Sequence, residues 1–356
     1  MIWLVWRQHR KQALFALLAL TALAAFLVPT GLQMHHAFEK AGLDDCLPAV
    51  ARVDFEAVGD QAQTPGRATD PASARNAACK DLARQFTGRF GSRGALGVLL
   101  WFVPLFAGLF WGAPLVAREI EHGTHRLVWT QGVSRLRWAL VKFGLVGAGV
   151  VLAAACYALL VTWWRAPLDQ ASGQRFLSPG PAFDIEGLVP VGYALFSVAL
   201  GVLGGVLTRK NQAAMAITLV GFLAVRLSVE VWARPHFLAP LRRTFAVQGT
   251  RQPNELSGDW VYRAGVYSAQ GKRIDGGVFG SWTSAFCPPS PTTAAHAPPT
   301  TISPCLAQYG PGAYNQELYH PASRFWLFQS LETTLFVAVA VLLLVAAIHW
   351  IRRRVS

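Results

Sequence analysis

The stretch PLVAREIEHGTHRLVWTQGVSRLRWALVK, residues 114–142, decides how the rest of the chain is interpreted. It is strongly charged and mostly cationic, with the charged residues Arg118, Glu119, Glu121, Arg126, Arg135, Arg137 and Lys142. Long apolar runs lie on both sides of it. Because the stretch is too polar for hydrocarbon and its flanks are too apolar for water, it predicts a short helical loop on the positively charged side of a membrane. Such a loop is a candidate contact surface for a cytoplasmic partner.

Composition indicates a membrane protein and not an ordinary soluble domain. Of the 356 residues, 53% are hydrophobic and 14% are charged, against about 25% charged residues in soluble domains. The formal net charge of +13 would also fit a nucleic-acid-binding protein. The basic residues, however, lie at the ends of apolar runs and in loops, with no basic stripe interleaved with aromatic residues. We therefore expect membrane lipids as partners and no nucleic acid.

Six apolar segments are each long enough to cross a hydrocarbon layer about 30 Å thick, at about 1.5 Å per helical residue. The expected spans are residues 13–32, 94–116, 138–164, 187–207, 213–231 and 325–350. The predicted fold class is therefore an all-α polytopic membrane protein with six transmembrane helices.

The segments outside the spans divide into short basic ones and longer ones. The short ones are a basic interfacial start, the charged loop, a tight turn and a C-terminal tail, at residues 1–12, 117–137, 208–212 and 351–356. The positive-inside rule places these segments, and both chain termini, in the cytoplasm. On the outer side lie a loop, a shorter connection and a large lobe, at residues 33–93, 165–186 and 232–324. The many prolines and glycines of the large lobe predict an irregular or partly β structure.

Cysteine positions agree with this topology. Four of the five cysteines fall in the two long outer segments, one pair in each, namely Cys46 with Cys79 and Cys287 with Cys305. In an oxidising compartment, pairing within each segment is the simplest of the three possible connectivities. Pairing between the two segments is the alternative.

Ionisable residues inside the expected spans are few. Arg226 and Glu230 lie one helical turn apart in the fifth span, and Glu332 lies in the sixth. All three lie roughly 20 to 25 Å from the cytoplasmic ends of their spans, so they can meet in an ion cluster that pairs Arg226 with one or both acids. A role in pinning two helices is favoured over a role in a substrate path, because a path would show more polar positions per helix.

Motifs for catalysis and for nucleotide binding do not occur in the sequence. No glycine-rich loop ends in Lys-Ser/Thr, so ATP and Mg would bind to a separate subunit. There is no HExxH, paired CxxC or G-x-S-x-G motif. The neighbouring histidines His35 and His36 come without a carboxylate constellation, which favours an interfacial flank over a metal site. We expect this chain to have no catalytic residue, metal or cofactor of its own.

The run of Arg118, Glu119, Glu121, Gly123 and Thr124, with Lys142 downstream, resembles the coupling loop of ABC-2 type transporter permeases, the transmembrane subunits of bacterial ABC exporters. The resemblance extends to the basic amphipathic start, the six spans and the large outer region between the fifth and sixth. The chain departs from the family pattern in that outer region. There the family often has short re-entrant helices, whereas this sequence is long, proline-rich and carries a cysteine pair.

The resemblance implies a permease of the bacterial plasma membrane that works as a dimer, expected to be a homodimer, with ABC ATPase subunits docked beneath it. It also implies that the ATPase-coupling residues are Arg118, Glu119, Glu121, His122, Gly123 and Thr124. A membrane-anchored sensor or assembly protein that uses its outer lobes for signalling or binding is the alternative. An integral membrane enzyme is disfavoured because no catalytic motif converges in the outer segments. Nothing in the sequence indicates the transported substrate.

Overall fold

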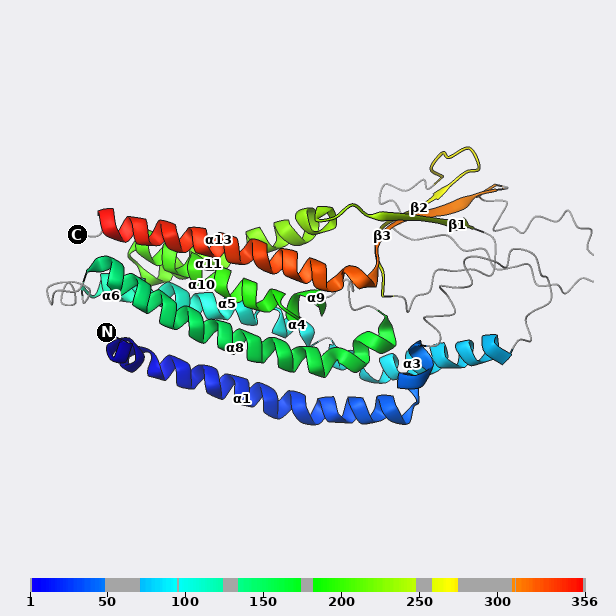
Figure 1. Ribbon diagram of the computed structural model, residues 1–356, viewed down its shortest axis with the longest axis horizontal. Helices are drawn as coiled ribbons and strands as arrows, with labels where there is room; N and C mark the ends of the chain where they lie inside the picture. The colour runs from blue at the N-terminus through cyan, green and yellow to red at the C-terminus, as the bar shows by residue number, and fades with distance from the viewer. Residues whose placement is uncertain are drawn as a thin grey trace, which may run out of the picture.

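The computed structural model describes residues 2–48, 71–94, 96–123, 134–173, 182–247, 258–274, 309–310 and 312–354. Within these ranges, six helical stretches are long and apolar enough to cross a membrane, which confirms the predicted fold class. They are His9–Lys40, Gly97–Glu121, Arg135–Ser172, Val189–Thr208, Asn211–His236 and Ala322–Arg353. Both chain ends lie at one end of the helix bundle, and a small sheet lies at the other (Figure 1).

Helices α1 (Ile2–Lys40) and α8 (Arg135–Ser172) are longer than the spans that hydropathy predicts. At about 1.5 Å per residue, each is nearly 60 Å long, about twice the thickness of the hydrocarbon layer, so both extend beyond it. The ends of α8 have local causes. The Oγ atom of Ser134 accepts a hydrogen bond from the backbone N–H of Arg137 at 3.3 Å, and Gly173 closes the helix with a φ of 62°.

The second span consists of short helical pieces: α4 (Gly97–Leu100), α5 (Val103–Ala107), the π-helical turn η1 (Gly108–Gly112) and α6 (Ala113–Glu121). Pro104 and Pro114 lack the backbone N–H that a continuous helix requires. Gly108 allows close approach of backbones, because a Cβ atom there would lie 2.5 Å from the carbonyl oxygen of Ser197. The span therefore packs tightly on α10 (Val189–Thr208), the most buried of the six.

Helix α10 lies at the centre of the bundle and contacts α6, α11 (Asn211–Ser228) and α13 (Phe325–Arg354). Aromatic rings fill the contact between α10, α11 and α13, namely Tyr193, Phe196, Phe222 and Phe336. Arg209, with a φ of 57°, makes the tight turn into α11. Helix α11 continues through the π-helical turn η2 (Val229–Ala233) and the 3-10 turn η3 (Arg234–His236).

The first outer segment contains α3 (Pro71–Gly94), which packs against α8. A disulfide joins Cys46 to Cys79 with a Cα–Cα distance of 6.0 Å, which confirms the pairing expected within this segment. The second expected pair, Cys287 with Cys305, lies outside the described residues.

The large outer lobe is partly β, as predicted. Its strands β1 (Leu241–Ala246), β2 (Trp260–Tyr267) and β3 (Tyr314–His320) form an antiparallel sheet in the order β1-β3-β2. Arg243 of β1 lies opposite Glu317 of β3, and their side chains form an ion pair at 2.7 Å. Strand β3 leads through the 3-10 turn η5 (Ala322–Arg324) directly into α13, which connects the lobe to the bundle.

The connection between α8 and α10 differs from the outer loop that the sequence predicts at residues 165–186. Helix α8 continues through Pro167 to Ser172, and a short helix, α9 (Ala182–Ile185), is buried throughout. Acidic side chains of this connection thereby enter the interior of the protein.

Candidate functional site

The first candidate site is the polar end of α6, at the same end of the bundle as the two chain termini (Figure 1). The helix ends after Glu121, where Gly123 adopts a φ of 70° that side chains disfavour. The side chains of Arg118, Glu121 and His122 are exposed. Thr124, the last expected coupling residue, lies outside the described residues. We call residues 118–123 the α6 end segment.

Glu119 points from the α6 end segment into the bundle. Its Oε1 atom lies 2.5 Å from the Nζ atom of Lys142 on α8, and the Lys142 side chain is only 1% exposed. The Nζ atom also lies 5.1 Å from the centre of the Trp138 ring. His9 of α1 lies close enough to interact electrostatically with both members of the pair. The pair therefore joins α6 to α8 beside the start of α1.

Glu121 makes a second connection. Its Oε2 atom accepts a hydrogen bond at 3.2 Å from the backbone N–H of Asn211, the first residue of α11. The preceding residue, Lys210, does not cap this helix start with its side chain, so Glu121 acts as the cap. It also places a negative charge at the positive end of the helix dipole. The two acids thus connect the segment to α8 and to the first turn of α11.

The second candidate site is a buried network of charges around Arg226. The sequence predicted a pair with Glu230, Glu332 or both. Instead, the Nη2 atom of Arg226 lies 3.3 Å from the Oδ2 atom of Asp184, and its Nη1 donates to the carbonyl oxygen of Trp101 at 2.9 Å. The partner differs because α9 brings Asp184 into the bundle from a stretch that was expected to form an outer loop.

Glu332 pairs with Arg234, which the sequence analysis did not single out. Arg234 donates from Nε and Nη2 to the two carboxylate oxygens of Glu332, at 2.8 and 2.9 Å. The same Nη2 lies 2.5 Å from Oδ1 of Asp184, and the hydroxyl oxygen of Tyr193 lies within hydrogen-bonding distance of both acids. Such two-point charge-assisted bonds fix the relative positions of the groups that they join.

The Arg226 network is closed to solvent, since Arg226 and Glu332 are 0% exposed and Asp184 is 2% exposed. Rings of Trp101 and Tyr193 cover the guanidinium of Arg226, with centres 3.6 and 4.3 Å away. Glu230 is half-buried and interacts electrostatically with Asp184 and both arginines. The network joins α9, α11, η3 and α13.

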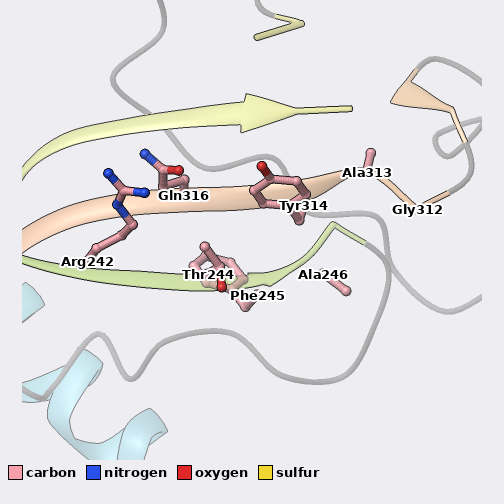
Figure 2. A pocket seen from close by; sticks show the side chains of 8 residues that line it. All are labelled: Arg242, Thr244, Phe245, Ala246, Gly312, Ala313, Tyr314 and Gln316. Atoms are coloured by element: carbon pink, nitrogen blue, oxygen red, sulfur yellow. The ribbon is translucent and has the colours of Figure 1, made fainter. Parts of the chain in front are cut away.

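A groove on the outer lobe is the third candidate site. It lies over β1 and β3 (Figure 2). Its volume is about 570 Å³. Its lining mixes polar, aromatic and small residues, namely Arg242, Thr244, Phe245, Ala246, Gly312, Ala313, Tyr314 and Gln316. Arg242 and Gln316 lie together at one end of the groove, with Tyr314 farther along β3 (Figure 2).

The described residues hold no group of three or more His, Cys, Asp or Glu side chains placed to bind a metal ion. The two histidines beyond the first expected span have other contacts. His35 stacks on Trp163 and hydrogen-bonds to its carbonyl oxygen, while His36 is exposed beside Glu39. Both lie at the outer part of α1, as an interfacial flank would.

A protein-family model described as ABC-2 membrane transporter related matches residues 17–234, which is more than half of the chain. The chain belongs to this family. The match includes the α6 end segment as well as Asp184 and Arg226, but it ends before the sheet and α13. Family membership identifies this ABC-2 protein as a multi-pass membrane subunit of a transport system, and permeases of this type generally work with an ATPase subunit. No curated protein and no solved structure matches the chain.

Proposed function

We propose that this ABC-2 chain is the permease subunit of an ATP-driven exporter in the bacterial plasma membrane. A separate ATPase subunit binds ATP and Mg and hydrolyses the nucleotide, and this chain converts that cycle into movement of a substrate across the membrane. The observation that carries the proposal is the α6 end segment, a polar helix end connected to two spans of a family member. Two copies of the permease assemble with the ATPase subunits, with chain termini in the cytoplasm.

The residues of the α6 end segment divide into two roles in this proposal. Arg118, His122 and Gly123 face outward and form the contact with the ATPase. Glu119 points into the bundle, and the exposed Glu121 bonds to the start of α11, so the two acids transmit the movement of the segment to α8 and α11. A push on the segment then reaches two spans at once, because the buried ion pair connects it to α8 and the helix cap connects it to α11.

Coexpression with an ABC ATPase from the same genome tests the proposal. We expect the ATPase to copurify with the wild-type permease and Arg118→Glu to reduce the amount recovered by several-fold, because a rim charge of the wrong sign repels the partner surface. The matched control is Arg352→Glu, which changes an exposed arginine at the same end of the bundle on α13. Failure of any ATPase to copurify with the wild type, or equal losses from the two variants, would contradict the proposal.

The groove over β1 and β3 supports a second candidate, a sensor or assembly protein that binds a ligand or partner outside the membrane. The two candidates differ in their need for ATP. An exporter moves its substrate only when the ATPase hydrolyses ATP, whereas a sensor signals upon ligand binding with an ATPase absent. Loss of function in a catalytically dead ATPase variant therefore favours the exporter.

A further inference from the structure

The groove over β1 and β3 lies on one face of the sheet, and the strand register shows which side chains share that face. Directly opposed residues of antiparallel strands point to the same side of a sheet. Leu318 of the central strand β3 pairs with Arg242 of β1 and with Arg263 of β2. The two arginines therefore lie on either side of Leu318 on the groove face. Their backbones are about 10 Å apart, twice the spacing of neighbouring strands.

The positive charge on this face is not balanced by the strand residues that the structure describes. Arg242 and Arg263 are exposed, and neither forms an ion pair with a described residue. Residues 241–246, 258–274 and 312–320 contain two acids, Asp259 and Glu317. Both acids pair with Arg243, at 2.9 and 2.7 Å, and Arg243 points to the opposite face because it follows Arg242 in β1. The groove face thus offers two guanidinium groups to a ligand.

Hydrogen-bonding groups and aromatic rings lie beside these arginines. Gln316 pairs with Thr244 of β1, so an amide and a hydroxyl group lie side by side in the groove (Figure 2). Farther along β3, the Tyr314 ring stacks on Tyr267 with the ring centres 5.7 Å apart. Amide and hydroxyl groups both donate and accept, which suits the hydroxyl groups of a sugar. Aromatic rings suit the apolar C–H faces of a sugar ring.

A third guanidinium lies over the same face. Gly265 of β2 pairs with Gln316, so a side chain at position 265 would point to the groove face. A Cβ atom there would lie 3.3 Å from Nε of Arg273. Arg273 therefore lies over the space that Gly265 leaves open, and arginines occur on this face from β1 to β2.

These groups together indicate the chemistry of the ligand. Guanidinium groups bind planar carboxylates through two parallel N–H donors. Because β3 separates Arg242 from Arg263, the two match single charges spread along a ligand better than the concentrated charge of a phosphate group. The exposed Arg242 and Thr244 leave the groove open to solvent, so a chain can lie along it. Carboxylates, hydroxyl groups and apolar ring faces occur together in a sugar chain that contains uronic acids.

We propose that the groove over β1 and β3 binds an acidic oligosaccharide, a sugar chain that carries carboxylate groups. Arg242 and Arg263 hold carboxylates, Gln316 and Thr244 bond to hydroxyl groups, and Tyr314 packs against a sugar ring. The site lies at the end of the protein opposite the chain termini (Figure 1). The proposal does not depend on the exporter function, and the binding assay below uses this chain without an ATPase.

Isothermal titration calorimetry tests the proposal, with the full chain in nanodiscs of zwitterionic lipid and tri-galacturonic acid as the probe. We expect the neutral sugar maltotriose to bind about tenfold more weakly, because it has no carboxylate for the arginines. Arg242→Gln and Arg263→Gln should each weaken binding of the acidic trimer by about tenfold and leave the unfolding midpoint unchanged, since both side chains are exposed. The matched control is Arg84→Gln, which changes an exposed arginine of α3, away from the sheet in Figure 1, and should bind as the wild type does.

Two further comparisons separate sugar recognition from attraction to any acid. Tyr314→Phe keeps the ring and should retain binding, whereas Tyr314→Ala should weaken it. A peptide of three glutamates should bind more weakly than tri-galacturonic acid, and equal binding would show that the groove selects charge or an acidic peptide and not a sugar. If tri-galacturonic acid does not bind, because residues outside the described ranges fill the groove or neutralise Arg242, the proposal is wrong. Unchanged affinity in Arg242→Gln and Arg263→Gln would overturn it as well.

Discussion

Replacing Glu119 with alanine should destabilise the fold, because the ammonium group of Lys142 would stay buried without its carboxylate partner. An exposed ion pair contributes less than about 1 kcal/mol, whereas removing one member of a buried pair costs about 3 to 5 kcal/mol. Lys142 is 1% exposed, but Glu119 is 17% exposed, so some water can enter and the lower end of that range applies. We therefore expect a loss of about 3 kcal/mol, roughly a hundred-fold in the folding equilibrium.

Thermal unfolding in detergent, followed by tryptophan fluorescence, measures this loss. The double variant Glu119→Ala with Lys142→Met removes both charges and should recover most of the stability, since a buried pair can be replaced by apolar groups at little cost. Glu39→Ala is the control, because Glu39 is an exposed acid with a weak contact to His36 at 3.9 Å. Equal effects of Glu119→Ala and Glu39→Ala, or no recovery in the double variant, would refute the reasoning.

Three further predictions concern other parts of the chain. Cys46→Ser breaks the bridge to Cys79 and should cost about 4 kcal/mol on the chain-entropy model, and an unchanged unfolding midpoint would argue against a closed bridge. Arg226→Leu leaves the charge of Asp184 poorly balanced and should yield less folded protein than Arg226→Leu with Asp184→Leu, and equal yields would count against the network. Burial lowers the pKa of His320 below its ordinary value of 6.5, so the unfolded state binds the proton more readily and stability should fall as pH drops below 6.5. His320→Gln should flatten that part of the pH profile, and a parallel profile would contradict the assignment.

Hydropathy and charge predicted the spans, because crossing a membrane requires long apolar helices whatever their neighbours are. The pairing of Cys46 with Cys79 followed from their positions in one outer segment. The exact ends of the helices could not be predicted from the sequence. Helix α8 extends past Trp164, through Pro167, to Ser172, and hydropathy does not detect a polar helical extension.

The sequence did not reveal which residues pair with the buried charges. Arg226 was expected to meet acids on its own helix or on the last span, but Asp184 comes from α9, which is too short to show periodicity. Asp184 and Glu186 were visible as acids in an otherwise apolar stretch, FDIEG, close to Arg165 in sequence. Similarly, the direction in which Glu119 points depends on Lys142, twenty-three positions away, and only the packing of α6 on α8 decides it.

Crosslinking most directly tests the claim that the α6 end segment contacts the ATPase subunit. A photo-crosslinking amino acid in place of the exposed His122 should form a covalent product with the ATPase in membranes that contain both subunits. The same amino acid in place of Thr244, exposed on β1 at the opposite end of the protein, should form none. Crosslinking from position 122 alone is the result that this account predicts. No product from position 122, or an equal product from position 244, would contradict it.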